Sequence, residues 1–82
     1  MYETINETIE VLVRFGKQTI APAVFRWRNK IYKIEKVNLA HSGKVGDEKW
    51  YYFSVSDDAN YYKLAFNSTT LKWYLDELYI EG

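Results

Sequence analysis

The sequence predicts an all-β domain: a small antiparallel, strongly bent sheet or partly open barrel, SH3-like or OB-like, of about five to six strands. Three observations predict it. Apolar and polar residues alternate with period two along most of the chain, and no stretch shows helical periodicity. Aromatic residues make up 18% of the chain and suit half-buried strand positions. The apolar phase also slips twice, which favours bent strands.

The length of 82 residues limits the chain to one domain, residues 1–82, in which residues 1–7 are extended or frayed. Because cysteine is absent, a disulfide framework and a Cys-based zinc site are excluded. No signal-peptide pattern is found, and no apolar run approaches the roughly 20 residues of a membrane span. We therefore expect a soluble cytoplasmic protein that does not contact a membrane.

The first strand is expected over residues 8–15. Ile9, Val11, Val13 and Phe15 alternate with polar residues, which indicates one buried face. Gly16 ends this strand, and residues 17–22 are expected to form a loop.

A hairpin is predicted over residues 23–37, with Asn29-Lys30 as a two-residue turn. This turn pairs Trp27 with Tyr32 and Arg26 with Lys33. One face of the hairpin is then apolar and the other basic. The apolar face holds Phe25, Trp27, Tyr32 and Ile34, and the basic face holds Arg26, Arg28 and Lys33.

After the hairpin, the apolar phase slips near Glu35-Lys36, which predicts a β-bulge. Residues 41–49 contain two glycines and are expected to form the longest polar loop. A three-stranded meander follows over residues 50–56, 61–66 and 71–76, with turns at residues 57–60 and 67–70. Its core face is predicted to hold Tyr51, Phe53, Val55, Tyr62, Leu64, Phe66, Leu71, Trp73 and Leu75.

The pattern Ile9-x-Val11, then Pro22-x-x-Phe25-x-Trp27-Arg28-x-x-x-Tyr32-x-Ile34-x-x-Val37, resembles a family of small bacterial all-β domains without an assigned function. The later runs Tyr62-x-Leu64-x-Phe66 and Trp73-x-Leu75-x-x-Leu78 resemble the final hairpin of that family. Segments similar to this family are appended to Y-family DNA polymerase-like proteins. The resemblance therefore implies a link to DNA metabolism, and no activity.

No catalytic constellation is present in the sequence. His41 and Ser42 are neighbours in the expected polar loop, where adjacent side chains point apart. Asp57-Asp58 follows a strand, where turn chemistry favours Asp, and no further acidic residues stand at calcium-loop spacing. We expect a non-enzyme with no catalytic residue, metal, cofactor or small-molecule substrate.

Charge is unevenly distributed although the net charge is zero. Residues 1–10 carry −3, residues 14–49 carry nine basic against three acidic side chains, or +6, and residues 50–82 carry −3. The basic middle either faces an anionic partner or pairs with the acidic ends within the fold. The candidate anion or nucleic-acid contacts are Arg26, Arg28, Lys30 and Lys33.

A second candidate surface is the reverse face of the meander, where four aromatic residues join Lys63 and Lys72. These rings would stack nucleic-acid bases, anchor a protein interface, or be buried under the N-terminal strand. The aromatic candidates are Trp50, Tyr52, Tyr61 and Tyr74.

The leading hypothesis is a non-enzymatic small β-barrel binding or accessory module that contacts nucleic acid or a DNA-processing protein. The alternative is a protein–protein or self-association module, such as a homodimer, that uses an exposed Trp/Tyr face.

Overall fold

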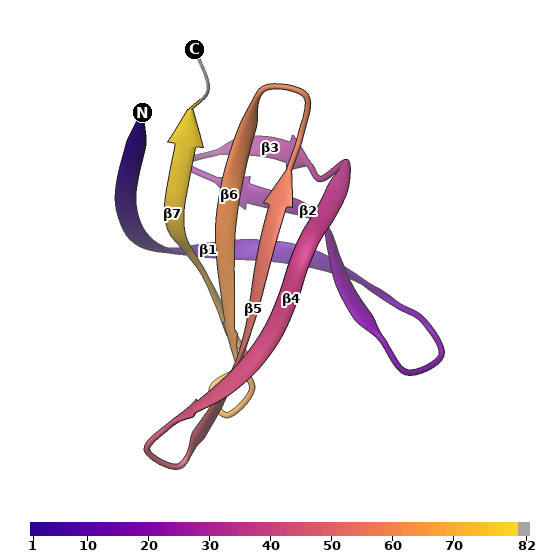
Figure 1. The fold of residues 1–82 in the computed structure, drawn as a ribbon. Helices are drawn as coiled ribbons and strands as arrows, with labels where there is room; N and C mark the ends of the chain where they lie inside the picture. Colours follow the sequence, from indigo (N-terminus) through magenta and orange to yellow (C-terminus); the bar gives the residue numbers. More distant parts are fainter. Residues whose placement is uncertain (81–82) are drawn as a thin grey trace.

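The computed structural model describes residues 1–80 and contains seven antiparallel strands in one open sheet (Figure 1). The strand order is β3-β2-β1-β7-β6-β5-β4. The strands are β1 (Tyr2–Phe15), β2 (Ile20–Trp27), β3 (Lys30–Lys33), β4 (Lys36–Val45), β5 (Glu48–Ser56), β6 (Asn60–Asn67) and β7 (Lys72–Ile80).

The all-β prediction is confirmed, but two details of the predicted fold are wrong. There are seven strands, and not five or six, because the second strand of the predicted hairpin is divided into β3 and β4. Strand β4 also continues through residues 41–45, which were expected to form a polar loop. The sheet is also open: β3 and β4 are its two edges, and no hydrogen-bonded ladder joins them within residues 1–80. The expected SH3-like or OB-like barrel is therefore not supported. No helix within the same residues is long and apolar enough to cross a membrane.

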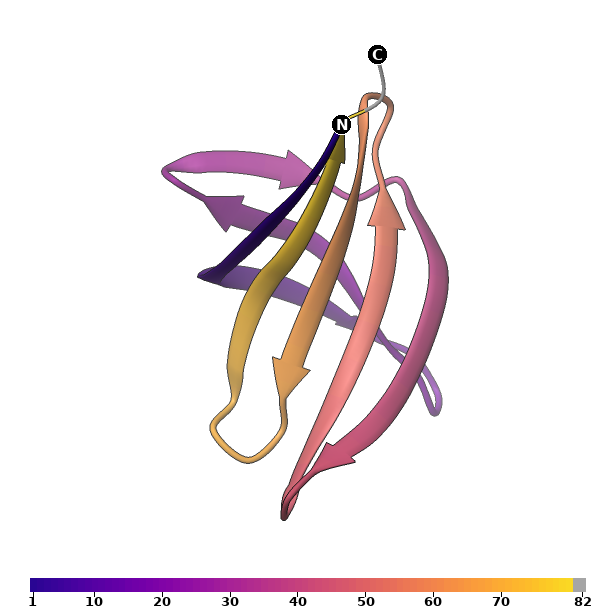
Figure 2. The same ribbon diagram turned by 60° about the vertical axis from the view of Figure 1, so that its left-hand side comes forward.

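Strand β1 bends, and this bend places the hairpin of β2 and β3 across the other strands (Figures 1 and 2). Its first part pairs with β7 and its second part pairs with β2. The β1–β7 register shifts between Thr4 and Glu7, where Asn6 adopts a left-handed φ of 55°. Such a bulge adds a residue on one strand and turns the strand. The N-terminal residues are thus extended and paired, and they are not frayed.

The β2–β3 hairpin turns at Arg28-Asn29 and not at Asn29-Lys30. Both turn residues have positive φ, 51° and 63°, as a two-residue primed turn requires. Phe25 consequently pairs with Tyr32, and Arg26 pairs with Ile31 instead of Lys33. The predicted register is wrong by two positions, yet the faces are right because side chains alternate with period two.

A break, and not a bulge, separates β3 from β4 at Ile34 and Glu35. The Ile34 N–H donates to the Ala23 carbonyl and the Glu35 N–H donates to the Ser56 carbonyl, both at 2.9 Å. A β-bulge does occur farther along the chain, in β4 between Val37 and Leu39. The apolar pattern also slips between Leu75 and Leu78, and the structure has a bulge at Asp76 there, because Lys63 pairs with Glu77 and Leu64 pairs with Leu75.

The core lies between the bent β1–β3 part and the face of β5–β7 that meets it. The predicted register of β5 and β6 is confirmed: Tyr51, Phe53 and Val55 pair with Phe66, Leu64 and Tyr62. The register of β6 and β7 that a turn at residues 67–70 predicts is wrong by two positions, because Asn67 pairs with Lys72 and Phe66 pairs with Trp73. An error of two positions preserves the faces, so the predicted core face is kept with one exception. Leu71 is the exception, since it lies in the last turn with 71% of its surface exposed. The buried core cluster comprises Ile9, Phe25, Trp27, Phe53, Val55, Tyr62, Leu64, Trp73, Leu75 and Leu78.

Candidate binding surfaces

The basic face of the β2–β3 hairpin lies against the acidic strand β1. Glu10 stands directly opposite Arg26, and their charged groups are 3.8 Å apart. The Arg28 guanidinium donates two hydrogen bonds to Glu7, from Nε at 3.2 Å and from Nη2 at 2.6 Å. Two of the four predicted anion contacts are thus matched by carboxylates of the same chain.

Glu7 is the acceptor of a small network at this place. The Trp27 indole donates to Glu7 Oε1 at 2.9 Å, and Arg28 Nε donates to the same oxygen. The Arg28 guanidinium lies 4.6 Å from the centre of the Trp27 ring. The hydrogen bonds from Arg28 and then from Trp27 hold the pKa of Glu7 below its usual value. The same pairing raises the pKa of Arg28. Of the two expected roles of the basic segment, this arrangement favours charge pairing within the fold over contact with an anionic partner.

The other two predicted contacts, Lys30 and Lys33, lie on edge strand β3 and are exposed. The Lys30 ammonium lies 5.4 Å from the centre of the Tyr32 ring. Neither lysine forms an ion pair within the described part of the chain. Any anion contact of the hairpin therefore rests on these two lysines.

Three of the four predicted aromatic residues, Trp50, Tyr52 and Tyr74, lie together on one side of the sheet, which we call the outer face. Tyr52 pairs with Ala65, and Ala65 pairs with Tyr74, so these residues share one side of the sheet. Trp50 is stacked on Tyr52 with ring centres 6.3 Å apart and lies 5.6 Å from Tyr74. His41, on β4, stacks on Tyr52 at 5.0 Å. We call His41, Tyr52, Trp50 and Tyr74 the aromatic row.

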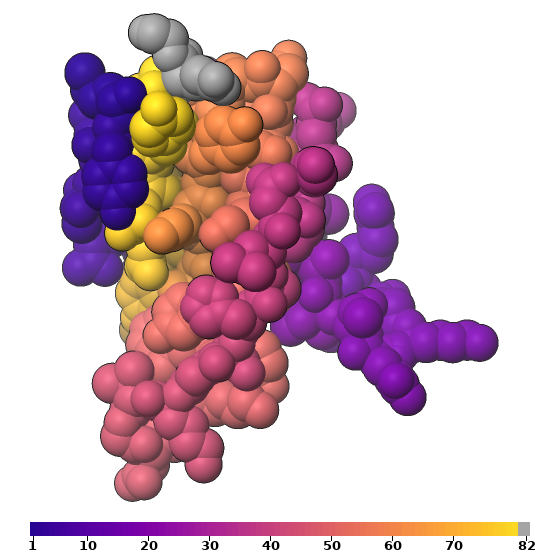
Figure 3. Space-filling view, in the orientation of Figure 1, coloured from indigo at the N-terminus to yellow at the C-terminus, as the bar shows by residue number. Residues whose placement is uncertain are grey.

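No strand covers the aromatic row within residues 1–80, so the alternative of burial under the N-terminal strand is wrong. Strand β1 joins the sheet beside β7 instead of lying over it (Figures 1 and 3). Trp50, Tyr52 and Tyr74 are half-buried by their contacts with one another and with the sheet. The Trp50 indole nitrogen is buried without a hydrogen-bond partner.

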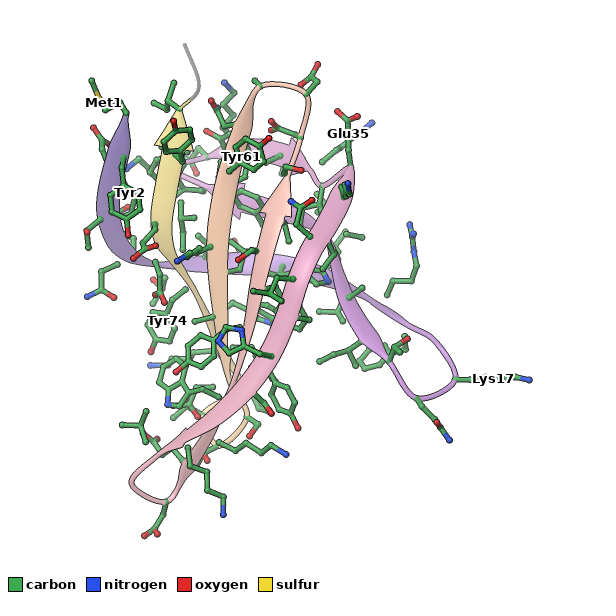
Figure 4. The ribbon with its side chains drawn as sticks, in the orientation of Figure 1. Met1, Tyr2, Lys17, Glu35, Tyr61 and Tyr74 are labelled. Carbon is green, nitrogen blue, oxygen red and sulfur yellow. The ribbon has the colours of Figure 1, made fainter. Side chains whose placement is uncertain are left out.

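Tyr61 does not belong to the aromatic row. It pairs with Tyr79 near the N-terminal end of β1, whereas Tyr74 lies farther along the sheet (Figure 4). The sequence could not separate the two groups because all these residues occupy the same face by alternation.

The residue pattern also did not reveal an apolar cleft of about 720 Å³ on the core side. The end of the β1–β2 hairpin projects from the body of the protein and leaves this cleft open (Figure 3). Phe15 was expected on the buried face, but its side chain stands at the cleft with 77% of its surface exposed. Because the cleft depends on the direction of the hairpin, nothing in the local pattern indicates it.

His41 and Ser42 are consecutive residues of a strand, so their side chains alternate and form no catalytic pair. His41 instead stacks on Tyr52. Within the described residues, no group of three or more His, Asp or Glu side chains is arranged to hold a metal ion. Asp57 serves its turn, where it accepts hydrogen bonds from the backbone N–H groups of Ala59 and Asn60.

Comparisons with protein-family models, curated proteins and solved structures find no match to this chain. The resemblance to a bacterial domain family therefore stays a prediction.

Proposed function

We propose that the protein is a non-catalytic binding module whose aromatic row takes a protein partner, in the simplest case a second copy of the same chain. The observation that carries this proposal is the stacked, half-exposed row of His41, Tyr52, Trp50 and Tyr74, which no strand covers within residues 1–80. Trp and Tyr are the residues that most often anchor protein interfaces.

The edge of the sheet supports the same partner. His41 belongs both to the aromatic row and to β4, whose ten residues are all exposed. Beyond the β-bulge between Val37 and Leu39, the β4 segment 39–43 contains no Lys, Arg, Asp or Glu and no proline. Long edge strands without such protection are ready to pair with another strand. Antiparallel pairing of two β4 strands near His41 would bring two aromatic rows together across one continuous sheet.

Analytical ultracentrifugation over a range of protein concentrations tests this proposal. We expect a concentration-dependent dimer that Trp50→Ala and Tyr52→Ala weaken. Leu39→Lys, which places a charge on the β4 edge, should also weaken it. Ile31→Lys on the β3 edge is the matched control, because Ile31 and Leu39 are both 57% exposed. A protein that stays monomeric throughout, or that responds equally to both Lys substitutions, would contradict association through β4.

Nucleic acid is the second candidate partner, and the exposed, unpaired Lys30 and Lys33 favour it. Binding to phosphates releases counterions and weakens steeply as salt rises. We expect Lys33→Glu to reduce binding to single-stranded or duplex DNA, whereas Arg26→Ala, which removes a paired charge, should reduce it less. Absence of binding at low salt, or binding that is insensitive to salt, would remove this candidate.

A further inference from the structure

A second group of aromatic residues occupies the outer face beyond the aromatic row. Tyr79 on β7 stands directly opposite Tyr2 on β1 and also opposite Tyr61 on β6. The three phenol rings therefore lie side by side across three neighbouring strands. Their exposed fractions are 57% for Tyr2, 47% for Tyr61 and 45% for Tyr79. We call these three residues the tyrosine cage.

The three tyrosines border an open pocket of about 260 Å³, whose lining also includes Asn38, Ser54, Val55, Tyr62, Lys63 and Glu77. The ring centres of Tyr61 and Tyr79 are 6.1 Å apart, and the ring planes meet at 62°. Rings at this distance and angle are in edge-to-face contact with each other, so a ligand would lie against the ring surfaces that border the pocket and not between the two rings. Tyr2 borders the same pocket, and the polar side chains of Lys63 and Glu77 line it beside the rings. Figure 4 shows Tyr2 and Tyr61 at the same end of the sheet.

Carboxylates outnumber basic groups at this place. The Lys63 ammonium lies 3.1 Å from Glu77 Oε1. The Tyr2 hydroxyl and the Lys63 ammonium lower the pKa of Glu77. Asp76 is the next residue along the β7 bulge. Burial and the nearby charge of Glu77 raise the pKa of Asp76, while Lys63 acts in the opposite direction. Lys63 makes the only ion pair of these two carboxylates within residues 1–80, so Asp76, which lies outside the pocket lining, has no ion-pair partner among the described residues.

We propose that the tyrosine cage of Tyr2, Tyr61 and Tyr79 binds a quaternary ammonium group. The faces of aromatic rings attract cations within about 6 Å, and cages of such rings suit methylated ammonium groups. A quaternary ammonium carries positive charge, has an apolar surface of methyl groups, and has no N–H that needs an acceptor. These properties match a pocket of phenol rings beside an excess of carboxylate. An unmethylated ammonium would compete with Lys63 for Glu77 and would lose more of its hydration.

Two sources could supply this group: a free small molecule such as choline, or a trimethylated lysine side chain of a peptide. The three tyrosines lie apart from the aromatic row, and Asn38 of the β4 edge also lines the pocket. A ligand held by cation–π contacts at an exposed site should bind weakly, with a Kd on the order of millimolar.

Titration followed by NMR tests the site with tetramethylammonium and choline as probes. We expect the signals of Tyr2, Tyr61 and Tyr79 to shift with both probes. The uncharged tert-butyl isostere of choline is the control for apolar binding and should leave these signals in place. If the isostere shifts them as much as choline does, or if neither cation shifts them, the proposal is overturned.

Variants separate the contributions of the rings from those of the charges. Tyr61→Leu and Tyr79→Leu should each weaken choline binding about two- to fivefold, whereas Tyr61→Phe should retain it because the π face remains. Tyr74→Leu, in the aromatic row, is the matched control and should not change it. Equal loss in Tyr61→Phe and Tyr61→Leu would contradict a cation–π contact, and thermal melting of each variant verifies that it is folded.

Substitutions of Lys63 and Glu77, which form an ion pair, should change choline affinity in opposite directions. Lys63→Met should tighten choline binding about two- to fivefold because it releases Glu77, and Glu77→Gln should weaken it by a similar factor. If Lys63→Met weakens binding, the cage does not act as a cation site. Peptides that differ only in trimethylation of one lysine identify the source: tighter binding of the methylated peptide than of choline assigns a peptide, and the reverse order assigns a free molecule.

Discussion

The indole nitrogen of Trp27 donates a hydrogen bond of 2.9 Å to the carboxylate of Glu7, and this bond connects the end of β2 to the bend of β1. Trp27 belongs to the buried core, and Arg28 covers its ring from the outside. Glu7 thus joins the core, the hairpin turn and the bend at one point.

Replacing Glu7 should loosen this junction. Glu7→Ala removes the acceptor of Trp27 and of Arg28, so the melting temperature should fall and Trp27 should become more accessible to a fluorescence quencher. Glu7→Gln keeps an oxygen acceptor for the indole, so its melting temperature should fall less. Glu10→Ala is the matched control, since its ion pair with Arg26 is longer and more exposed. An equal effect of Glu7→Ala and Glu10→Ala would contradict the role given to Trp27.

The charge of Glu7 gives a pH dependence. Its pKa is lowered in the folded state, so its contribution to stability is fully present above its ordinary value of about 4.5 and is lost as the pH falls through the lower folded pKa. Thermal melting between neutral and acidic pH should show this loss, and the loss should be smaller in Glu7→Gln. A Glu7→Gln variant with the same acid profile as the parent protein would argue against it.

Leu75 is fully buried at the centre of the core, with 0% of its surface exposed. Leu75→Ala should lower the free energy of unfolding by about 2–5 kcal/mol, because it removes apolar contacts and leaves a cavity. Leu12→Ala, at a position with 69% exposure, is the control and should change it by less than about 0.5 kcal/mol. Denaturant unfolding measures both, and similar losses in the two variants would contradict the assigned core.

Asp57 organises the β5–β6 turn and also reaches Tyr62. Its Oδ1 accepts from the N–H groups of Ala59 at 2.8 Å and Asn60 at 2.7 Å, and its Oδ2 accepts from the Tyr62 hydroxyl at 2.9 Å. Burial alone would raise the pKa of Asp57, but these hydrogen bonds outweigh it and lower the pKa. Burial, together with the bond to Asp57, raises the pKa of Tyr62 to about 12.

Ultraviolet titration of the tyrosines should therefore reveal one group that ionises near pH 12, well above the ordinary value of 10.0. Tyr62→Phe should remove that group. Asp57→Ala should lower the free energy of unfolding by about 1–3 kcal/mol because the turn loses its acceptor. Tyrosines that all titrate together near the ordinary value would show that Tyr62 is not buried against Asp57.

Asn67 is the one buried polar residue of the described chain, with 3% exposure. Its Oδ1 accepts from the N–H groups of Thr69 and Thr70, and its amide nitrogen donates to Glu48. Asn67→Ala should cost about 1–3 kcal/mol of unfolding free energy. Asn67→Asp keeps an oxygen that accepts from the two backbone N–H groups but places a second carboxylate beside Glu48, so the loss of stability should be smaller when Glu48→Gln is also present. If Glu48→Gln leaves the cost of Asn67→Asp unchanged, Glu48 does not pair with Asn67.

Local alternation was enough to predict most of the core. Phe25, Trp27, Leu64 and Leu75 are buried as the period-two pattern indicated, and the turn at residues 57–60 lies where Asp57 predicted it. The two faces of the hairpin were predicted correctly although the register was wrong, because the error was two positions and side chains alternate with period two. An error of one position would have exchanged the faces. These features depend on residues close together in the chain.

The features on which the proposed binding sites rest were decided by the tertiary structure. Alternation does not say which strand lies beside which, so the sequence could not show that β1 lies between β7 and β2. That placement pairs Arg28 with Glu7 and Arg26 with Glu10, so two of the four predicted basic contacts are matched by carboxylates of the same chain. It also aligns Tyr2 with Tyr79 and Tyr61 in the cage and leaves the aromatic row uncovered within residues 1–80. The sequence alone determined which side chains share a face; strand partnership over long separations decided which charges are matched and which rings meet.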